Sequence, residues 1–589
     1  MTRAQTHGDY PPETLRQYAL IADGERGALC GPQGELVWMC APRWHDDAVF
    51  ASLIGGSGAY AVTPRSRCVW SGQYEPGSLI WRNRWTTVDN DIIECRDALA
   101  APAGPRGAVL LRRIEALKGA AHMTVALMAC AGFGSERMRD LRHRDGVWTA
   151  RTGTLRLRWT GAGDATVDDD GRLTIELTVS EGGHHDLVLE IANHPLVAEP
   201  VRAADAWQQT EQFWAHEVPA FDDCAAPRDT RHAYAVLRGM TSSSGGMVAA
   251  ATMSLPERAD QGNNYDYRYA WIRDQCFAGL AVAADGPHPL LQTGVEFISE
   301  RILADGPDLR PGYLVNGGSM PAESELPLKG YPGGWNVRGN KVTHQFQLDV
   351  FGEVLNLFAA ARRHDQLGRD ALRAARVAVE AIERRWTEPD AGIWELDDQW
   401  WTHSRLACVS GLRAYAAGAP DAERSRLREL ASAMLTETTR RCLHPDGFWQ
   451  RTPDDQRVDS ALLLPAVRGG FRADDPRAIA TLDAVQRDLV DDGYVYRYRP
   501  AGRTLGEKEG AFLLCGFVLA LAQLRAGRVI GAYRCFERNR AASGTPGLLS
   551  EEFDVEQRQL RGNLPQAFVH AMLLETSVRL AADSPTEGN

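Results

Sequence analysis

The residues of this chain that are best suited to chemistry are carboxylates set among tryptophan and arginine. Glu395 lies in the segment GIWELDDQWWTHSR, directly after Trp394 and shortly before Trp401. A carboxyl beside tryptophan in an apolar cleft has its ionised form disfavoured, so it tends to stay protonated near neutral pH, as a general acid must. The alternative interpretation is a surface carboxylate with tryptophan packed beneath it.

A second pair of carboxylates comes near the end of the chain. Glu551 and Glu552 stand side by side in LLSEEFD, in a predicted loop before the last helix. Neighbouring carboxylates are usually just solvated. Because 156 residues separate Glu395 from Glu551, no local periodicity brings these two together. Only a closed barrel would place them in one site.

Two further segments combine aromatic rings with polar groups. In YDYRYAWIRDQ, Arg273 and Asp274 follow Tyr267. An arginine next to an aspartate can grip vicinal hydroxyls, one side chain donating and the other accepting. An ion pair at the start of a helix is an equally good interpretation. In KGYPGGWNVRGN, Trp335 lies in a Gly/Pro loop, where its ring is either a packing plug or a stacking platform for a sugar.

Other kinds of chemistry lack their motifs. The sequence has no G-x-x-x-x-G-K-[ST], no H-E-x-x-H, no G-x-S-x-G and no clustered Cys/His set, so we expect no metal and no cofactor. The net charge of −12, from 65 basic and 77 acidic residues, argues against nucleic acid or an anionic membrane as partner, because both need a basic face. The residues alone predict a carbohydrate-like cleft with carboxylates.

Cysteine usage and the chain's start predict a cytoplasmic protein. The eleven cysteines are odd in number, scattered and never spaced C-x-x-C, which is typical of reduced, buried thiols. The N-terminal stretch MTRAQTHGDYPPETLRQY lacks the apolar region of a secretory signal. The longest apolar stretch, near 511–523, is too short to span a bilayer and reads as a buried helix.

The elements that must position these residues change character near residue 200. A length of 589 residues is too great for one ordinary core. Before residue 200, apolar residues alternate with polar ones, as Leu173, Ile175, Leu177 and Val179 do, which favours short strands in an antiparallel sandwich.

From about residue 201 the apolar period becomes helical. Phe351, Val354, Leu355 and Phe358 follow the i, i+3, i+4, i+7 spacing. About twelve helical segments between 228 and 582, joined by long loops, suit a barrel of paired helices whose loops build the site at one end. We therefore expect three parts: a β-sandwich domain over 1–200, a helical linker over 201–227 and a helical barrel over 228–589.

Taken in order, the four segments resemble glycoside hydrolase family 15, which holds glucoamylases, glucodextranases and bacterial trehalases. The stretch YALIADGERGALCGPQGELVWMCAPRWHDDAVFASLIGG at 19–56 looks like the start of the bacterial trehalase-like members, and VDSALLLPAV at 458–467 and EGAFLLCGF at 509–517 also fit. The resemblance covers nearly the whole chain. It implies an N-terminal antiparallel β-sandwich packed on an (α/α)6 barrel, and inversion at the anomeric carbon.

The resemblance also implies roles for individual residues. Glu395 resembles the general acid and Glu551 the general base. Arg273 and Asp274 match the pair that holds the non-reducing-end glucose, and Tyr267 matches an aromatic residue near the scissile bond. The remaining candidates for substrate contact are the loop residue Trp335, Trp394, Glu552, and either Arg497 or Arg499 of VYRYRP.

The implied activity is that of an inverting, exo-acting α-glucosidase that acts on trehalose or a short α-glucan and releases β-glucose. A phosphorolytic (α/α)6 enzyme is a second hypothesis, against which the carboxylate at Glu551 argues. A non-catalytic sugar-binding or regulatory protein is a third, and it has no chemical need for both Glu395 and Glu551. The expected partner is a small carbohydrate, and a homo-oligomer is possible.

Overall fold

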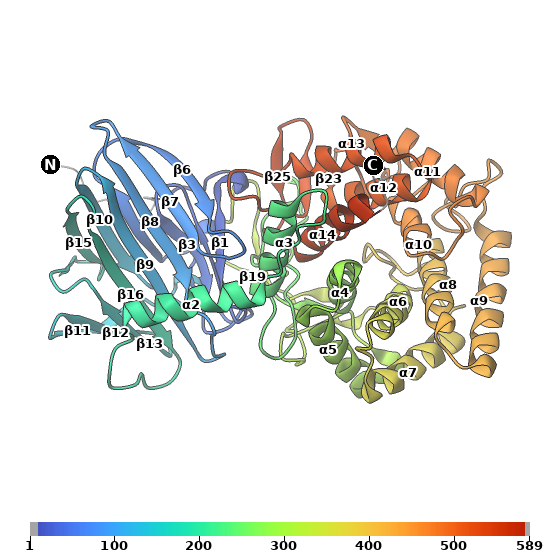
Figure 1. Cartoon of the computed structure of the whole chain (residues 1–589), viewed down its shortest axis with the longest axis horizontal. Helices are drawn as coiled ribbons and strands as arrows, with labels where there is room; N and C mark the ends of the chain where they lie inside the picture. Colours follow the sequence, from blue (N-terminus) through green and yellow to red (C-terminus); the bar gives the residue numbers. More distant parts are fainter. Residues whose placement is uncertain (1–9, 583–589) are drawn as a thin grey trace, which may run out of the picture.

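The computed structural model describes residues 10–582, and Figure 1 shows a sheet-rich half followed by a helical half. The N-terminal stretch without an apolar signal region lies partly in residues 1–9, outside the described residues. Two antiparallel sheets face each other in the first half. One sheet runs in the order β1 (Ala19–Ala22), β2 (Gly27–Cys30), β3 (Glu35–Cys40), β5 (Ala59–Pro64), β10 (Ala121–Met128), β15 (Leu173–Val179) and β14 (Thr166–Val167), with β4 (Ala48–Phe50) on β3.

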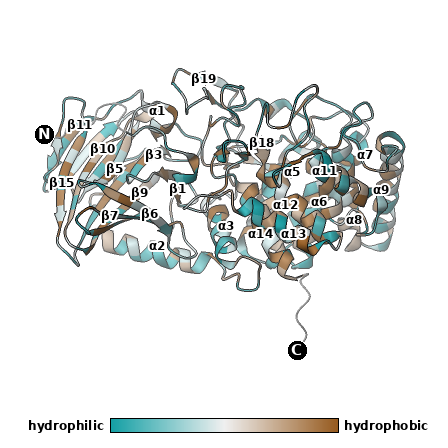
Figure 2. Cartoon of the chain, turned by 90° about the horizontal axis from the view of Figure 1, so that it is seen from above, coloured by the Kyte–Doolittle hydropathy of each residue, from teal (hydrophilic) through white to brown (hydrophobic). Residues whose placement is uncertain are grey.

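The second sheet is antiparallel throughout and covers the first. Its order is β11 (Arg139–Arg144), β12 (Val147–Thr152), β13 (Leu155–Thr160), β16 (His184–Ala192), β9 (Gly107–Lys118), β8 (Ile92–Leu99), β7 (Trp81–Thr87) and β6 (Cys68–Tyr74). The short turn α1 (Ala131–Gly134) follows β10. Brown and teal residues alternate along many of these strands (Figure 2), which is the pattern of strands with one buried face.

The sandwich core is apolar but encloses one ion pair. Met123, Val125 and Leu127 of β10 point into a cluster that draws side chains from both sheets. Within it, Arg112 Nε lies 2.7 Å from Asp97 Oδ1, and neither side chain is exposed. Arg112 also donates to two backbone carbonyls. Buried charges persist only when they are paired and hydrogen-bonded in this way.

Helix α2 (Ala203–Glu217) runs along the sandwich toward the barrel (Figure 1). Its Trp207 ring lies beneath the guanidinium of Arg96, 4.4 Å from the ring centroid, and the indole N–H donates to Asp186 Oδ1. The helix is therefore anchored to the second sheet. The domain limits predicted at 200 and 228 stay a prediction.

Among the described residues, twelve helices form the barrel as two concentric rings of six. The inner helices are α4 (Ile272–Asp285), α6 (Asp349–Arg363), α8 (Thr402–Ala417), α10 (Leu464–Val467), α12 (Leu513–Arg525) and α14 (Ala567–Ala582). Each contacts the next, and α14 contacts α4, which closes the ring. The outer helices are α3 (Pro227–Gly239), α5 (Pro289–Asp305), α7 (Arg369–Arg385), α9 (Asp421–Cys442), α11 (Pro476–Asp488) and α13 (Val529–Arg540).

Burial explains the order of the rings. Nearly every residue of α4, α12 and α14 is buried, as expected for helices with neighbours on all sides, whereas α7 and α9 bury only one face. Among the described residues, the connecting loops contain 3-10 turns, short strand pairs and one three-stranded sheet, β23-β24-β25. These strands are β17 (Ala270–Trp271), β18 (Gly312–Tyr313), β19 (Ser324–Leu326), β20 (Asn336–Arg338), β21 (Val490–Asp491), β22 (Tyr494–Val495), β23 (Ala511–Phe512), β24 (Glu552–Asp554) and β25 (Gln559–Arg561).

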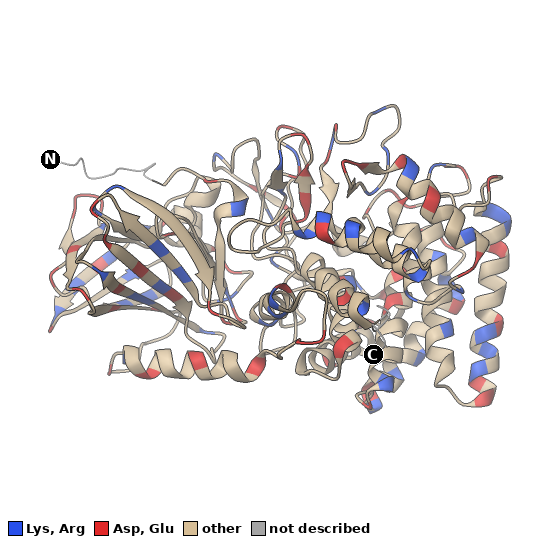
Figure 3. Cartoon of the chain, turned by 45° about the horizontal axis from the view of Figure 1, so that its top comes forward, with Lys and Arg blue, Asp and Glu red and all other residues tan. Residues whose placement is uncertain are grey.

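The predicted fold class, an antiparallel β-sandwich followed by an (α/α)6 barrel, is confirmed. Among the residues drawn in Figure 3, Lys and Arg are interspersed with Asp and Glu over both halves rather than gathered into one basic face. Within residues 10–582, no helix combines the length and the apolar character needed to cross a membrane.

Candidate active site

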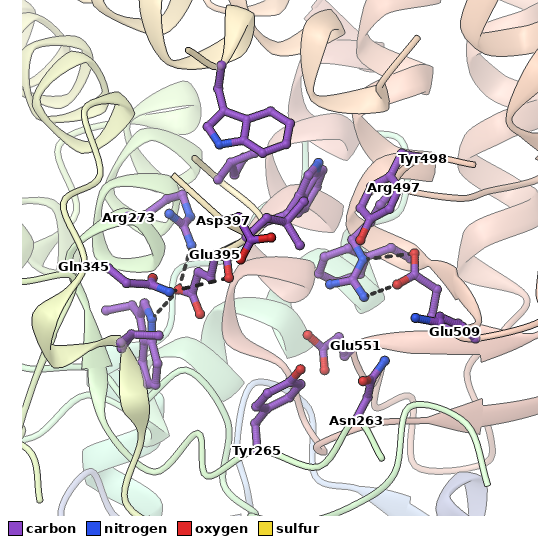
Figure 4. Close-up of a pocket in the computed structure, with 18 of the residues that line it drawn as sticks. Asn263, Tyr265, Arg273, Gln345, Glu395, Asp397, Arg497, Tyr498, Glu509 and Glu551 are labelled. Carbon is purple, nitrogen blue, oxygen red and sulfur yellow. Dashed lines mark hydrogen bonds and ion pairs between the residues drawn. The ribbon is translucent and has the colours of Figure 1, made fainter. Parts of the chain in front are cut away.

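A cavity of about 700 Å³ opens among the loops of the barrel (Figure 4). It brings together most of the residues predicted from the sequence. Those that line it are Tyr267, Arg273, Asp274, Trp394, Glu395, Arg497 and Glu551. Arg273, Asp274 and Glu551 are buried, whereas Lys341, Asp397 and Lys508 of the same lining are exposed. The cavity therefore has a buried inner end and an exposed rim.

The β-sandwich positions the segment that carries Tyr267. Arg268 forms a buried ion pair with Asp266, with Nη2 2.7 Å from Oδ2, and donates to the backbone carbonyl of Asp46 in the sandwich at 2.8 Å. The Tyr267 carbonyl accepts from the N–H of Ala250. Since Arg268 is fixed from behind, its neighbour Tyr267 is directed toward the cavity.

Glu395 sits on a backbone turn that few residues other than glycine adopt. Its φ is 55°, in the left-handed region, and strain of this kind persists only where the surroundings enforce it. Asp390 supplies the enforcement: Oδ2 accepts from the Gly392 N–H and from the Ser404 hydroxyl, and Oδ1 pairs with Arg405. The loop is thus tied to α8, which bears Ser404 and Arg405.

The Glu395 carboxyl accepts three hydrogen bonds at Oε1. The donors are Trp271 Nε1 at 2.8 Å, Arg273 Nη2 at 3.2 Å and Gln347 Nε2 at 3.4 Å. The sequence predicted an apolar wall made by Trp394, but the Trp394 indole donates to Asp459 Oδ1 instead, at 2.9 Å. Trp271, which precedes α4, is therefore the tryptophan that touches Glu395. It holds the carboxyl through a hydrogen bond and not as part of an apolar wall.

Glu551 is supported differently, by burial and a single donor. The Tyr267 hydroxyl donates to Oε1 at 3.1 Å, and Oε2 has no hydrogen-bond partner among the described residues. Burial, followed by the negative charge of Glu257, raises the pKa of Glu551 well above its usual range, while Arg497 and the Tyr267 hydrogen bond oppose that rise.

Glu552 points away from the cavity. It begins β24, where successive side chains face opposite sides, so Glu551 and Glu552 diverge. Glu552 Oε2 accepts from the Gly510 N–H at 2.6 Å. Its Oε1 lies 3.3 Å from Arg497 Nη2, and Glu552 is not among the residues that line the cavity. The predicted substrate contact of Glu552 is not made at the cavity surface.

Arg497 is held by three carboxylates at once. Its guanidinium pairs with Glu257 at 3.2 Å and Glu509 at 2.5 Å as well as with Glu552. Oxygens of these three carboxylates lie within 4.8 Å of one another, close enough to hold a metal ion. Arg497 already supplies a positive charge to all three. The expectation of no metal stays a prediction.

Two other predicted residues also lie outside the cavity. Arg499 is exposed, and its Nη2 donates to the carbonyl of Asp488. Trp335 is 45% exposed. The Trp335 loop docks on the sandwich instead, where the Gly330 N–H and the Asn336 side chain both donate to the carbonyl of Ile54. Of the two arginines left open by the sequence, the structure brings Arg497 to the cavity.

Sequence reasoning missed the residues that hold Glu395 from behind. Gln347 and Asp349 lie beside Arg273, in the segment THQFQLDVFGE at the start of α6. A buried glutamine shortly before an inner helix and a buried aspartate at its first residue are the signal that marks them, but only the ring closure shows that this helix start faces α4.

An (α/α)6 barrel with two separately supported carboxyls in one polar cavity is an arrangement that suits glycoside hydrolysis. Comparison with known proteins agrees. The sequence pattern described as Glycosyl hydrolases family 15 matches residues 231–578, and that described as Trehalase-like, N-terminal matches residues 2–214. The chain belongs to glycosyl hydrolase family 15, which confirms the resemblance seen in the sequence.

Relatives match over nearly the full length. The trehalase of Mycobacterium tuberculosis is 29% identical over 97% of this chain and 90% of its own. Trehalase 2 of Sulfolobus acidocaldarius is 24% identical over 94% and 97%. A bacterial glucoamylase solved with acarbose superposes with a TM-score of 0.66 at 14% identity, covering 98% of this chain and 94% of that one, which supports the fold.

Proposed function

We propose that this chain is an inverting, exo-acting α-glucosidase that hydrolyses trehalose or a short α-glucan and releases β-glucose. The observation that carries the proposal is the placement of Glu395 and Glu551 in one cavity on two different supports. The trehalases among the relatives favour trehalose as the first substrate to test.

In the proposed mechanism, Glu395 protonates the glycosidic oxygen while ionised Glu551 takes a proton from a water on the opposite face of the sugar. Inverting enzymes separate the two carboxyls by about 6.5–9.5 Å to admit that water. Trp271 holds Glu395 and Tyr267 holds Glu551, and these two rings meet edge to face with centroids 5.5 Å apart.

The inner end of the cavity suits a terminal glucose. Arg273 offers N–H donors there. No described side chain donates a hydrogen bond to the Asp274 carboxyl, and burial raises its pKa to about 7. Asp274 is therefore available to hydroxyl groups of a sugar. Because the buried end admits one chain terminus and the leaving group lies toward the exposed rim, this arrangement supports exo action.

The test is hydrolysis of trehalose, maltose, isomaltose and maltotriose, with the anomer of the first glucose released read by NMR. We expect β-glucose, and α-glucose as the first product would refute inversion. A parallel incubation with inorganic phosphate, assayed for glucose 1-phosphate, tests the phosphorolytic alternative.

Variants assign the roles of the two carboxyls. Glu395→Gln and Glu551→Gln should each lower kcat by about 10²–10⁴-fold while leaving binding largely intact. Glu552→Gln is the matched control, since Glu552 adjoins Glu551 but faces Arg497. If Glu552→Gln abolishes turnover and Glu551→Gln does not, the base is Glu552.

We also propose that the enzyme acts in the cytoplasm. Its cysteines are all free and mostly buried, which suits a reducing compartment. Cell fractionation tests this location, and light scattering of the purified chain tests the homo-oligomer that the sequence left open.

A further inference from the structure

Arg273 lies between two carboxyls, only one of which belongs to the proposed mechanism. Its Nη2 lies 3.2 Å from Glu395 Oε1, and its Nη1 lies 3.6 Å from Asp349 Oδ2 and donates to Gln347 Oε1 at 2.7 Å. Asp349 is the first residue of α6 and is fully buried. No donor among the described residues makes a hydrogen bond within 3.5 Å to either carboxyl oxygen, and the ion-pair partner, Arg273, stands at 3.6 Å. A buried carboxyl left in this state calls for an explanation.

The contacts of Glu395 pose a second question. A general acid must carry a proton, yet Trp271, Arg273 and Gln347 all donate to the same oxygen, and donors of this kind stabilise a carboxylate.

Among the charged groups that face Asp349, Arg273 is the cation that pairs with it. The titratable groups that face it are Arg273 on α4, Glu395 and Asp390 on the loop after α7, Cys408 on α8 and Glu353 on α6 itself. Asp390 has its own partner in Arg405, and Glu353 lies 3.8 Å from Arg468, which it shares with Glu575. Glu395 additionally faces Asp274 and Glu551, both acidic.

We propose that Asp349 is a positioning residue that shares the single charge of Arg273 with Glu395, so that the two carboxyls retain one proton for the glycosidic oxygen. The inference rests on the proposed role of Glu395 as general acid. One guanidinium balances one carboxylate. Ionising both carboxyls would leave a net negative charge in a buried site, so the pair keeps its last proton to higher pH than one carboxyl with an arginine to itself would.

The test is Asp349→Asn, which keeps the size of the side chain and removes its charge. Arg273 then pairs with Glu395 alone. The alkaline limb of the kcat profile should therefore move to lower pH by about one unit, and kcat should be about tenfold lower above that limb. Hydrolysis of α-glucosyl fluoride should lose much less, because fluoride departs without a proton. An alkaline limb that stays in place or moves up overturns the proposal, and so does an equal loss on the fluoride.

Glu353→Gln is the matched control. Glu353 lies one turn along α6 and is buried, with its pKa raised to about 7, but it faces Arg468. The alkaline limb of the kcat profile of Glu353→Gln should stay in place. A limb that moves as it does in Asp349→Asn would overturn the specific role of Asp349.

Two further measurements separate the possible failures. If thermal melting shows that Asp349→Asn does not fold, Asp349→Ser replaces it in the same comparison. If Glu395→Gln leaves turnover intact, the proposed function fails. If Glu395→Gln abolishes turnover on natural substrates and Asp349→Asn leaves the limb unmoved, only this inference fails.

Discussion

The Tyr267 hydroxyl is the one hydrogen-bond donor that the described residues offer to the Glu551 carboxyl, at 3.1 Å. Replacing Tyr267 with phenylalanine removes that donor and keeps the ring that packs against Trp271. Since a donor to a carboxylate lowers its pKa, the substitution should raise the pKa of Glu551 further above its usual range. The general base must be ionised, so the acid limb of the kcat/KM profile should move to higher pH.

The size of the shift follows from the geometry. A hydrogen bond to a charged group contributes about 1.5–3 kcal/mol, and 1.36 kcal/mol corresponds to one pKa unit. A contact of 3.1 Å is longer than the 2.5–2.7 Å typical of a hydroxyl on a carboxylate, which favours the lower end of that range. We therefore expect a shift of about one unit, with activity about tenfold lower below the limb and unchanged well above it.

The assay is initial-rate hydrolysis of trehalose from pH 4 to pH 9 in buffers of constant ionic strength. Tyr265→Phe is the control, because its ring stacks on Tyr267 with centroids 5.9 Å apart but its hydroxyl makes no hydrogen bond to Glu551. An acid limb that moves down in Tyr267→Phe, or by the same amount in Tyr265→Phe, would refute the assigned contact.

Two other predictions concern stability. Burial lowers the pKa of His570 to about 3, so the unfolded chain takes up a proton at higher pH than the folded chain does. The free energy of unfolding should therefore decrease as the pH drops below about 6.5, by about 2 kcal/mol at pH 5. His570→Gln keeps an acceptor for the Leu549 N–H and should lose less Tm between pH 7 and pH 5; equal losses would count against this assignment. Arg112→Met strands buried Asp97 and should cost about 3–5 kcal/mol in chemical unfolding, whereas Arg137→Met, which breaks an exposed pair with Asp170, should cost about 1 kcal/mol or less; similar costs would contradict the burial argument.

The sequence predicted the architecture well because periodicity is a local property. Alternation in β15 and the helical spacing in α6 are both readable within ten residues. The choice between Arg497 and Arg499 depended instead on distant partners. Glu257, Glu509 and Glu552 converge on Arg497 from three parts of the chain, and no pattern around VYRYRP reveals that.

Trp335 illustrates the same limit from the other side. Its Gly/Pro loop resembled a sugar platform, but contacts with Ile54, some 280 residues earlier, draw the loop onto the sandwich. A family resemblance shows which residue types occur and in which order. The docking of one domain on another decides which side chains reach the cavity.

The two carboxyls acquire their roles from partners on opposite sides of the site. Glu395 is partly open to the cavity and bound by donors, and Glu551 is buried and short of them. Burial taken alone favours the protonated form of Glu551, whereas a general base must be ionised. The correction comes from charge shared across elements: Asp349 competes with Glu395 for Arg273, and Tyr267 with Arg497 offsets the burial of Glu551. Neutralising Asp349 should therefore move the alkaline limb of the pH profile to lower pH. Removing the Tyr267 hydroxyl should move the acid limb to higher pH. Because the two changes act on separate carboxyls, the double variant should show both shifts, nearly additively.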